Sequence, residues 1–113
     1  MKIKYLWLIA IQMFLSLQAL ATQDEYLFCF AGAQKNWGYC GKVSDPDLKS
    51  ACIVSAMRLW TKCNDIKNED IKNACLGVGL ENWGFCSQIK NPNLAKACDL
   101  GAKKFWGQCS DLK

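Results

Sequence analysis

Histidine is absent from this chain of 113 residues, and its absence removes several kinds of chemistry. Without it there is no Ser–His or Cys–His pair, and the usual general base of enzymes is missing. No two of the eight cysteines lie two to four residues apart, which is the spacing that most zinc sites need. We therefore expect no enzymatic activity, no metal site and no cofactor.

Charge of one sign and long apolar runs are also scarce. The chain has 14 basic and 10 acidic residues, and this excess is too small to indicate binding to nucleic acid. After residue 21, no apolar stretch approaches the roughly 20 residues that a membrane-spanning helix needs. We expect neither a nucleic-acid partner nor a transmembrane segment in the mature protein.

The first 21 residues follow the order of a secretory signal peptide. A basic start, Met1–Lys4, precedes an apolar run, Tyr5–Leu17, and Ala19-Leu20-Ala21 is a small-x-small cleavage site. The alternative is an uncleaved anchor, but the run of about 13 residues is short for one. The pattern predicts cleavage of residues 1–21 and an exported protein, periplasmic or secreted.

The cysteines define an internal repeat. Their spacing alternates between 11 and 12 residues, so two cysteines recur every 23 residues, and an even number in an exported chain predicts a disulfide framework. Four units then make up a single domain over residues 22–113. The units are 22–44, 45–67, 68–90 and 91–113.

Each unit has the pattern of a helical hairpin. Asp45, Asn68 and Asn91 stand at position 1, where a side-chain oxygen can cap a helix. Apolar or small residues at positions 4, 7, 8, 11 and 12 mark one helical face, and position 12 is always small. We expect a bend near position 13 or 14, and a second, shorter helix that Asn36 or Asn82 caps. The predicted fold is all-α: four disulfide-bonded hairpins that form a small α-solenoid or a compact bundle.

Two disulfide schemes fit this hairpin. A bend midway between the two cysteines of a unit would bring them face to face, which we prefer because both end units keep both cysteines. The rival scheme joins each second cysteine to the first of the next unit, and leaves Cys29 and Cys109 free, joined to each other, or bonded to another chain. The preferred pairs are Cys29–Cys40, Cys52–Cys63, Cys75–Cys86 and Cys98–Cys109.

A tryptophan occupies position 16 of every unit: Trp37, Trp60, Trp83 and Trp106. Because repeated aromatic residues usually fill the groove between stacked hairpins, we expect these four in the core. The alternative is a ladder of aromatic faces that binds sugar rings. Glycine follows three of the tryptophans, and we expect this step to lie at a chain bend where glycine adopts a positive φ.

The unit resembles a loosely defined class of exported bacterial proteins that are built from short cysteine-bearing helical hairpins. The pattern is Asn-Pro-Asn-Leu-Ala-Lys-Ala-Cys at 91–98, followed by Trp-Gly-Gln-Cys-Ser-Asp-Leu-Lys at 106–113. It is also similar to the cysteine-rich secreted relatives of tetratricopeptide repeats, although their units are longer. The resemblance implies an exported helical fold and no particular activity.

These features favour a binding or structural module in the bacterial envelope or outside the cell, whose partner is another protein or an envelope component. The alternative is a small exported toxin, killing factor or inhibitor, carried on a mobile element. A catalytic carboxylate pair among Asp65, Glu69, Asp70 and Glu81 is a third hypothesis, but these positions fit caps and solvated helix faces. We expect the lysines to solvate the outer faces, with a basic contact surface as the alternative.

Overall fold

The computed structural model describes residues 23–112, and every regular element in that range is a helix. Each unit contains a long α-helix followed by a short 3-10 helix, so the predicted all-α repeat is confirmed. The predicted signal peptide and its cleavage site lie outside the described residues. The elements are the helix at 23–34, η1 (Trp37–Lys42), α2 (Pro46–Ala56), η2 (Trp60–Asp65), α3 (Glu69–Gly79), η3 (Trp83–Gln88), α4 (Pro92–Ala102) and η4 (Trp106–Leu112).

The helices begin where the sequence predicts. The side chains of Asp45, Asn68 and Asn91 accept hydrogen bonds from backbone N–H groups in the first turns of α2, α3 and α4. Asn36 and Asn82 cap η1 and η3 in the same way. These caps satisfy donors that have no partner within the helix, and they fix where each helix starts.

Every long helix ends in the same turn. At position 14 the backbone adopts a positive φ of 53–63°, and the N–H of position 15 donates to the carbonyl of position 10. This is a Schellman motif, so the predicted bend is confirmed. The expectation of a positive φ at the Trp-Gly step was wrong, since no described glycine has one. The position-14 residues are Lys35, Arg58, Glu81 and Lys104.

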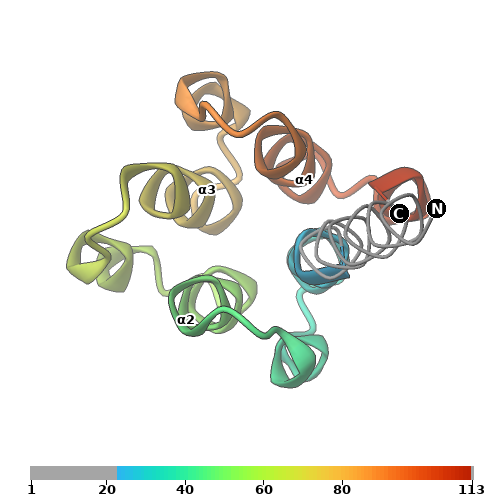
Figure 1. The fold of residues 1–113 in the computed structure, drawn as a ribbon, viewed down its shortest axis with the longest axis horizontal. Coiled ribbons are helices and arrows are strands. Elements are labelled where there is room, and N and C mark those ends of the chain that lie inside the picture. Colours follow the sequence, from blue (N-terminus) through green and yellow to red (C-terminus); the bar gives the residue numbers. More distant parts are fainter. Residues whose placement is uncertain (1–22, 113) are drawn as a thin grey trace, which may run out of the picture.

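The four units close into a ring. Figure 1 shows the long helices side by side around a central axis, with the 3-10 helices outside them. The last unit meets the first: an added Cβ at Gly101 of α4 would lie 3.6 Å from the carbonyl oxygen of Cys29, and Trp106 packs edge-on against Phe30. The fold is therefore the compact bundle rather than an open solenoid.

The disulfides join neighbouring units, so the preferred pairing within units was wrong. The bonds are Cys40–Cys52, Cys63–Cys75, Cys86–Cys98 and, closing the ring, Cys29–Cys109. None of the pairs Cys29–Cys40, Cys52–Cys63, Cys75–Cys86 or Cys98–Cys109 forms. The reason is geometric: the cysteine at position 8 of each long helix faces the 3-10 helix of the preceding unit, not that of its own.

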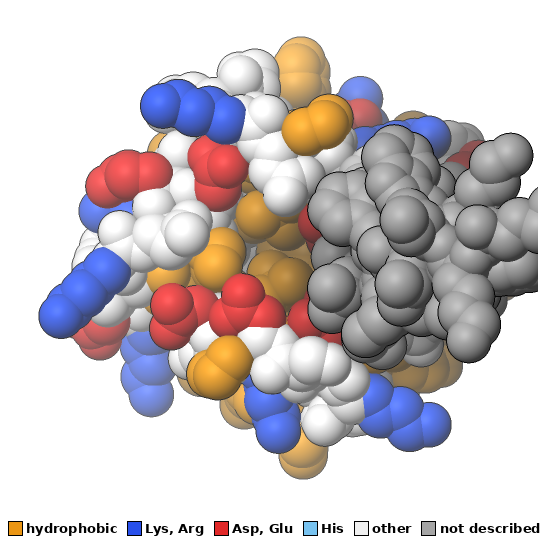
Figure 2. Space-filling model, in the orientation of Figure 1, with side chains coloured by type: hydrophobic (Ala, Val, Ile, Leu, Met, Phe, Trp, Pro, Cys, Tyr) orange, Lys and Arg blue, Asp and Glu red, His pale blue; other side chains and the backbone are white. Residues whose placement is uncertain are grey.

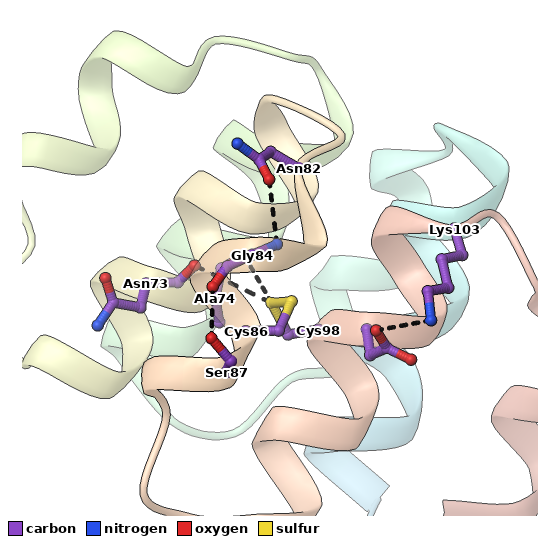
Figure 3. The surroundings of a disulfide bond; sticks show 9 residues. Asn73, Ala74, Asn82, Gly84, Cys86, Ser87, Cys98 and Lys103 are labelled. Carbon is purple, nitrogen blue, oxygen red and sulfur yellow. Dashed lines mark hydrogen bonds and ion pairs between the residues drawn. A yellow bond between two sulfur atoms is a disulfide. The ribbon is translucent and has the colours of Figure 1, made fainter.

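The helices beside these disulfides approach the sulfur atoms closely. Figure 3 shows Cys86 of η3 joined to Cys98 of α4 beside α3. A Cβ added at Gly77 of α3 would lie 2.6 Å from the sulfur of Cys98, so this position requires glycine. Position 12, which is small in every unit, is buried as predicted.

The axis of the ring is filled in layers, one residue from each unit. Position 7 supplies Phe28 and three alanines, all fully buried. Position 11 supplies Val78 with Gly32, Ser55 and Gly101, and a Cβ added at Gly32 would lie 2.6 Å from Val78. Each layer thus combines one large side chain with three small ones, which leaves little room for further aromatic residues on the axis. The three alanines are Ala51, Ala74 and Ala97.

Candidate functional site

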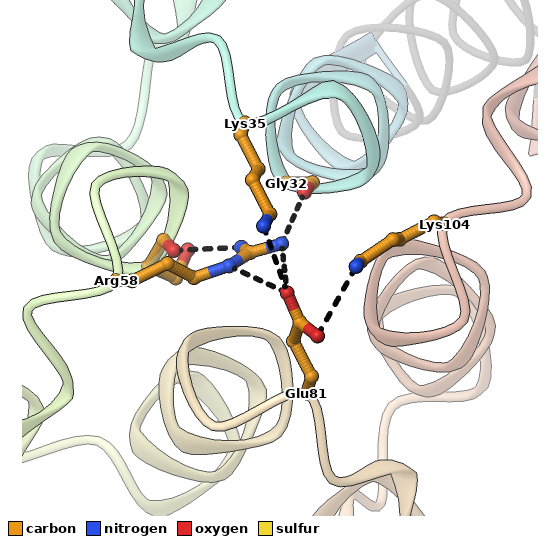
Figure 4. A network of polar contacts seen from close by, with 6 residues as sticks. Gly32, Lys35, Arg58, Glu81 and Lys104 are labelled. Carbon is orange, nitrogen blue, oxygen red and sulfur yellow. Dashed lines mark hydrogen bonds and ion pairs between the residues drawn. The ribbon is translucent and has the colours of Figure 1, made fainter.

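Four charged side chains meet where the long helices end (Figure 4). Glu81 lies 3.4 Å from the ammonium of Lys35, 3.1 Å from the guanidinium of Arg58 and 3.2 Å from the ammonium of Lys104. All four residues occupy position 14, and the shared turn aims them toward the axis. One carboxylate therefore neutralises only part of the charge of three cations.

Arg58 also forms hydrogen bonds with the C-terminal ends of two long helices. Its guanidinium donates to the carbonyl oxygens of Ser55, at 2.9 Å, and Gly32, at 3.2 Å. These carbonyls lie at the negative ends of helix dipoles, where a cation is favourable. The cluster thus holds two units together across their C-terminal ends.

The surroundings of Glu81 decide its protonation. Burial acts to raise its pKa, but the hydrogen bonds from Lys104 and Lys35 and the charges of Arg58 and Lys104 together outweigh burial and lower the pKa below its usual value. Glu81 is therefore ionised at neutral pH, and it acts as the anionic centre of the cluster.

A tryptophan lies two residues after each position-14 residue, and the expectation that the tryptophans form the core was wrong. Trp37, Trp60, Trp83 and Trp106 are 57%, 43%, 58% and 53% exposed. The reason is that each one begins a 3-10 helix, and the 3-10 helices lie outside the long helices. Three of the tryptophans contact the next unit: the Cβ of Trp60 lies 3.2 Å from an added Cβ at Gly79, Lys103 lies over the Trp83 ring at 5.1 Å, and Trp106 packs against Phe30.

The other exposed apolar side chains lie in the same region. We call residues 34–39, 57–62, 80–85 and 103–108 the tryptophan end. Among the described residues, all nine large apolar side chains that are exposed belong to it. Besides the four tryptophans, they are Tyr39, Met57, Leu59, Leu80 and Phe105.

The opposite end of the ring has different chemistry. Figure 2 shows acidic side chains gathered around a hollowed apolar centre. A hollow of about 190 Å³ lies among the first turns of the long helices. The side chains that line it are Glu25, Asp45, Leu48, Asn68, Asp70, Ile71, Asn91 and Leu94.

Glu25 is the unusual residue of that hollow. It is only 6% exposed, and its Oε2 has no hydrogen-bond partner. Burial, and then the charge of Asp24, raise its pKa to about 7. Its neighbour Asp24 is satisfied, since its two oxygens accept the N–H groups of Ser44 and Asp45 at 2.8 and 3.0 Å.

Glu25 should make stability depend on pH. Its pKa is higher in the folded protein than in the unfolded chain, so the folded state binds more protons, and the stability due to its protonated form is lost as pH rises through about 7. We expect the free energy of unfolding to fall between pH 5 and pH 8, and Glu25→Gln to raise it by about 2 kcal/mol at pH 8. Urea unfolding at pH 5, 6.5 and 8 measures both. Parallel pH profiles for the two proteins would contradict this role of Glu25.

The four carboxylates considered for catalysis do not come together. Glu69 and Asp70 lie in the first turn of α3, whereas Glu81 lies just beyond its other end. Both oxygens of Asp70 accept backbone N–H groups, from Lys90 and Asn91. Asp65 ends η2 on the outside of the ring. Within residues 23–112, no group of three His, Cys, Asp or Glu side chains is placed to hold a metal ion.

The position-14 cluster is the feature that sequence reasoning missed. From the sequence, Glu81 is interpreted only as a possible catalytic carboxylate and the lysines only as solvated residues or a basic contact surface, and Arg58 has no assigned role. Aligning the units at position 14 gives Lys, Arg, Glu, Lys, and this column of one acid among three bases was the available signal.

Comparison with protein-family models, with characterised proteins and with solved structures finds no match for this chain. The chemistry of the described residues therefore carries the functional argument. Four disulfides indicate an oxidising, extracytoplasmic setting. Among the helices of the described part, none is long and apolar enough to cross a bilayer.

Proposed function

We propose that this protein is an exported binding module of the bacterial envelope, and that it binds through the tryptophan end. The observation that carries the proposal is that all nine exposed large apolar side chains of the described residues lie in the turns that end the long helices or in the first residues of the 3-10 helices that follow. Exposed apolar clusters bordered by polar groups mark interaction sites in small proteins. Tryptophan and arginine are also enriched at such sites.

The rigidity of the ring supports the same role. Four disulfides and a packed axis hold the four tryptophans in fixed positions, so little conformational entropy is lost when they bind. The absence of histidine and the separation of the carboxylates give no support to an enzymatic role.

The experiment is co-sedimentation of the oxidised protein with total envelope fragments, which contain both membrane and cell wall. We expect Trp37→Ser/Trp83→Ser to weaken sedimentation about tenfold or more, because these two indoles are the most exposed. Melting should change little, since more than half of each side chain already contacts solvent. The comparison measures bound protein and the melting temperature in the same samples.

A matched control changes the opposite end of the ring. Asp47→Ser/Glu69→Ser replaces two exposed residues in first turns and leaves the tryptophan end intact. Binding should survive in this variant. Equal sedimentation of all three proteins, or loss of binding only with loss of folding, would contradict the proposed function.

A further inference from the structure

Closure of the ring places equivalent residues of the four units at similar heights along its axis. All four disulfides connect equivalent positions, with Cα–Cα distances of 5.5–5.8 Å, and the fourth joins the last unit to the first. Because the fourth unit contacts the first, successive units are related by rotation about the ring axis, with little displacement along that axis. Residues at equivalent positions therefore lie at equal height around the axis, and the four tryptophans form a level circle.

A level circle does not suit a linear glycan. A sugar chain that stacks on aromatic side chains needs them in a row, and an open solenoid would supply one. Closure instead spreads the indoles around the perimeter, where only a broad, flat surface contacts all four at once. This geometry argues against the glycan ladder that the sequence allowed.

The charges of the ring are separated along its axis. The tryptophan end contains five basic residues, namely Lys35, Arg58, Lys62, Lys103 and Lys104, and a single acidic one, Glu81. In contrast, the described residues at positions 1 to 4 include six acidic residues and no basic one. Lysines at positions 5, 21 and 23 flank these acidic residues, namely Lys42, Lys49, Lys67, Lys72 and Lys90. The excess of positive charge at the tryptophan end would therefore attract an anionic surface more strongly than the opposite end does.

We propose that the tryptophan end docks on the surface of a membrane that contains anionic phospholipids; this inference rests on the proposed function and names its partner. Tryptophan prefers the membrane–water interface, where its apolar body and polar N–H are both accommodated. The half-exposed indoles, with Met57, Leu59, Leu80 and Phe105, enter the headgroup region. Lys35 and Lys104, whose side chains are 52% and 48% exposed, meet lipid phosphates.

The depth of insertion follows from the exposure. The tryptophans are 43–58% exposed, so only their outer halves are free to enter the lipid. The protein lies on the membrane without spanning it. Binding depends on salt as well as on apolar contact, because the attraction between surface charges is screened over about 8 Å at physiological ionic strength.

The test uses large vesicles of phosphatidylglycerol and phosphatidylcholine in equal amounts, and vesicles of phosphatidylcholine alone. The oxidised protein should bind the first and not the second. Indole fluorescence should shift to shorter wavelength on binding, and lipids with bromine on their acyl chains should quench it. Absence of binding to the anionic vesicles would overturn the proposal.

Two double variants with the same change in net charge separate docking from general attraction. Lys35→Ala/Lys104→Ala removes two half-exposed cations from the cluster at the tryptophan end, and Lys49→Ala/Lys96→Ala removes two exposed cations elsewhere. We expect the first to weaken vesicle binding about tenfold and the second to have little effect. Equal weakening, or binding without quenching by brominated lipid, would show adsorption without docking and would overturn the proposal.

Failure here is distinguishable from failure of the proposed function. If the protein sediments with total envelope fragments through its tryptophans but ignores anionic vesicles, its partner is a protein or the cell wall, and only the membrane proposal fails. If it binds neither, both proposals fail.

Discussion

Replacing Cys29 and Cys109 by alanine should lower the free energy of unfolding by about 4 kcal/mol. This bond spans 80 residues of sequence, whereas each of the others spans 12. In the chain-entropy account, a disulfide stabilises by restricting the unfolded chain, and a longer loop gives a larger effect. The three shorter bridges reduce the effective loop, and the value of about 4 kcal/mol allows for this.

The matched control is Cys63→Ala/Cys75→Ala, which should cost about 3 kcal/mol. All four of these cysteines are fully buried, so the two variants lose similar packing and differ mainly in the loop that they open. Denaturant unfolding of both variants measures the difference. If opening the ring costs no more than removing an internal bridge, packing between Phe30 and Trp106 already holds the first and last units together.

The local features of the fold could be predicted because their causes are local. Asp45 caps α2 through N–H groups two and three residues away, so the signal for this turn lies within one short segment. The bend at position 14 likewise follows the end of an apolar face. The residues that adopt it, such as Glu81, are not glycine, so composition alone gave no signal for the positive φ.

The disulfide pairing could not be predicted because two hairpins of nearly equal length compete. Separations of 11 and 12 residues both suit a tight turn, and the choice depends on which helix lies beside position 8. The argument from complete end units failed for a physical reason. A closed ring has no end units, so Cys29 and Cys109 find each other and leave no described cysteine free.

The prediction that the tryptophans form the core was wrong because other side chains fill the axis of the ring. Phe28 and Val78 occupy layers whose other members are alanine, glycine or serine, and this left space for helices to approach but not for indoles. Small residues recurring at positions 7 and 11 were visible in the sequence. These small residues exclude the tryptophans from the axis only when the four units close into a ring, and the sequence of a single unit does not show that closure.

Phe28→Ala should be among the most destabilising single substitutions, at about 3–5 kcal/mol, because it leaves a layer of four alanines around a cavity. Ala74 occupies position 7 of the opposite unit and is fully buried in the same core. We therefore expect Phe28→Ala/Ala74→Phe to recover at least half of the loss, although Ala74→Phe alone overpacks the axis and destabilises the protein. Urea unfolding of the two single variants and the double variant gives the coupling free energy between the two sites. If the losses of the single variants simply add, the two side chains do not share one layer, and the axial packing described here is wrong.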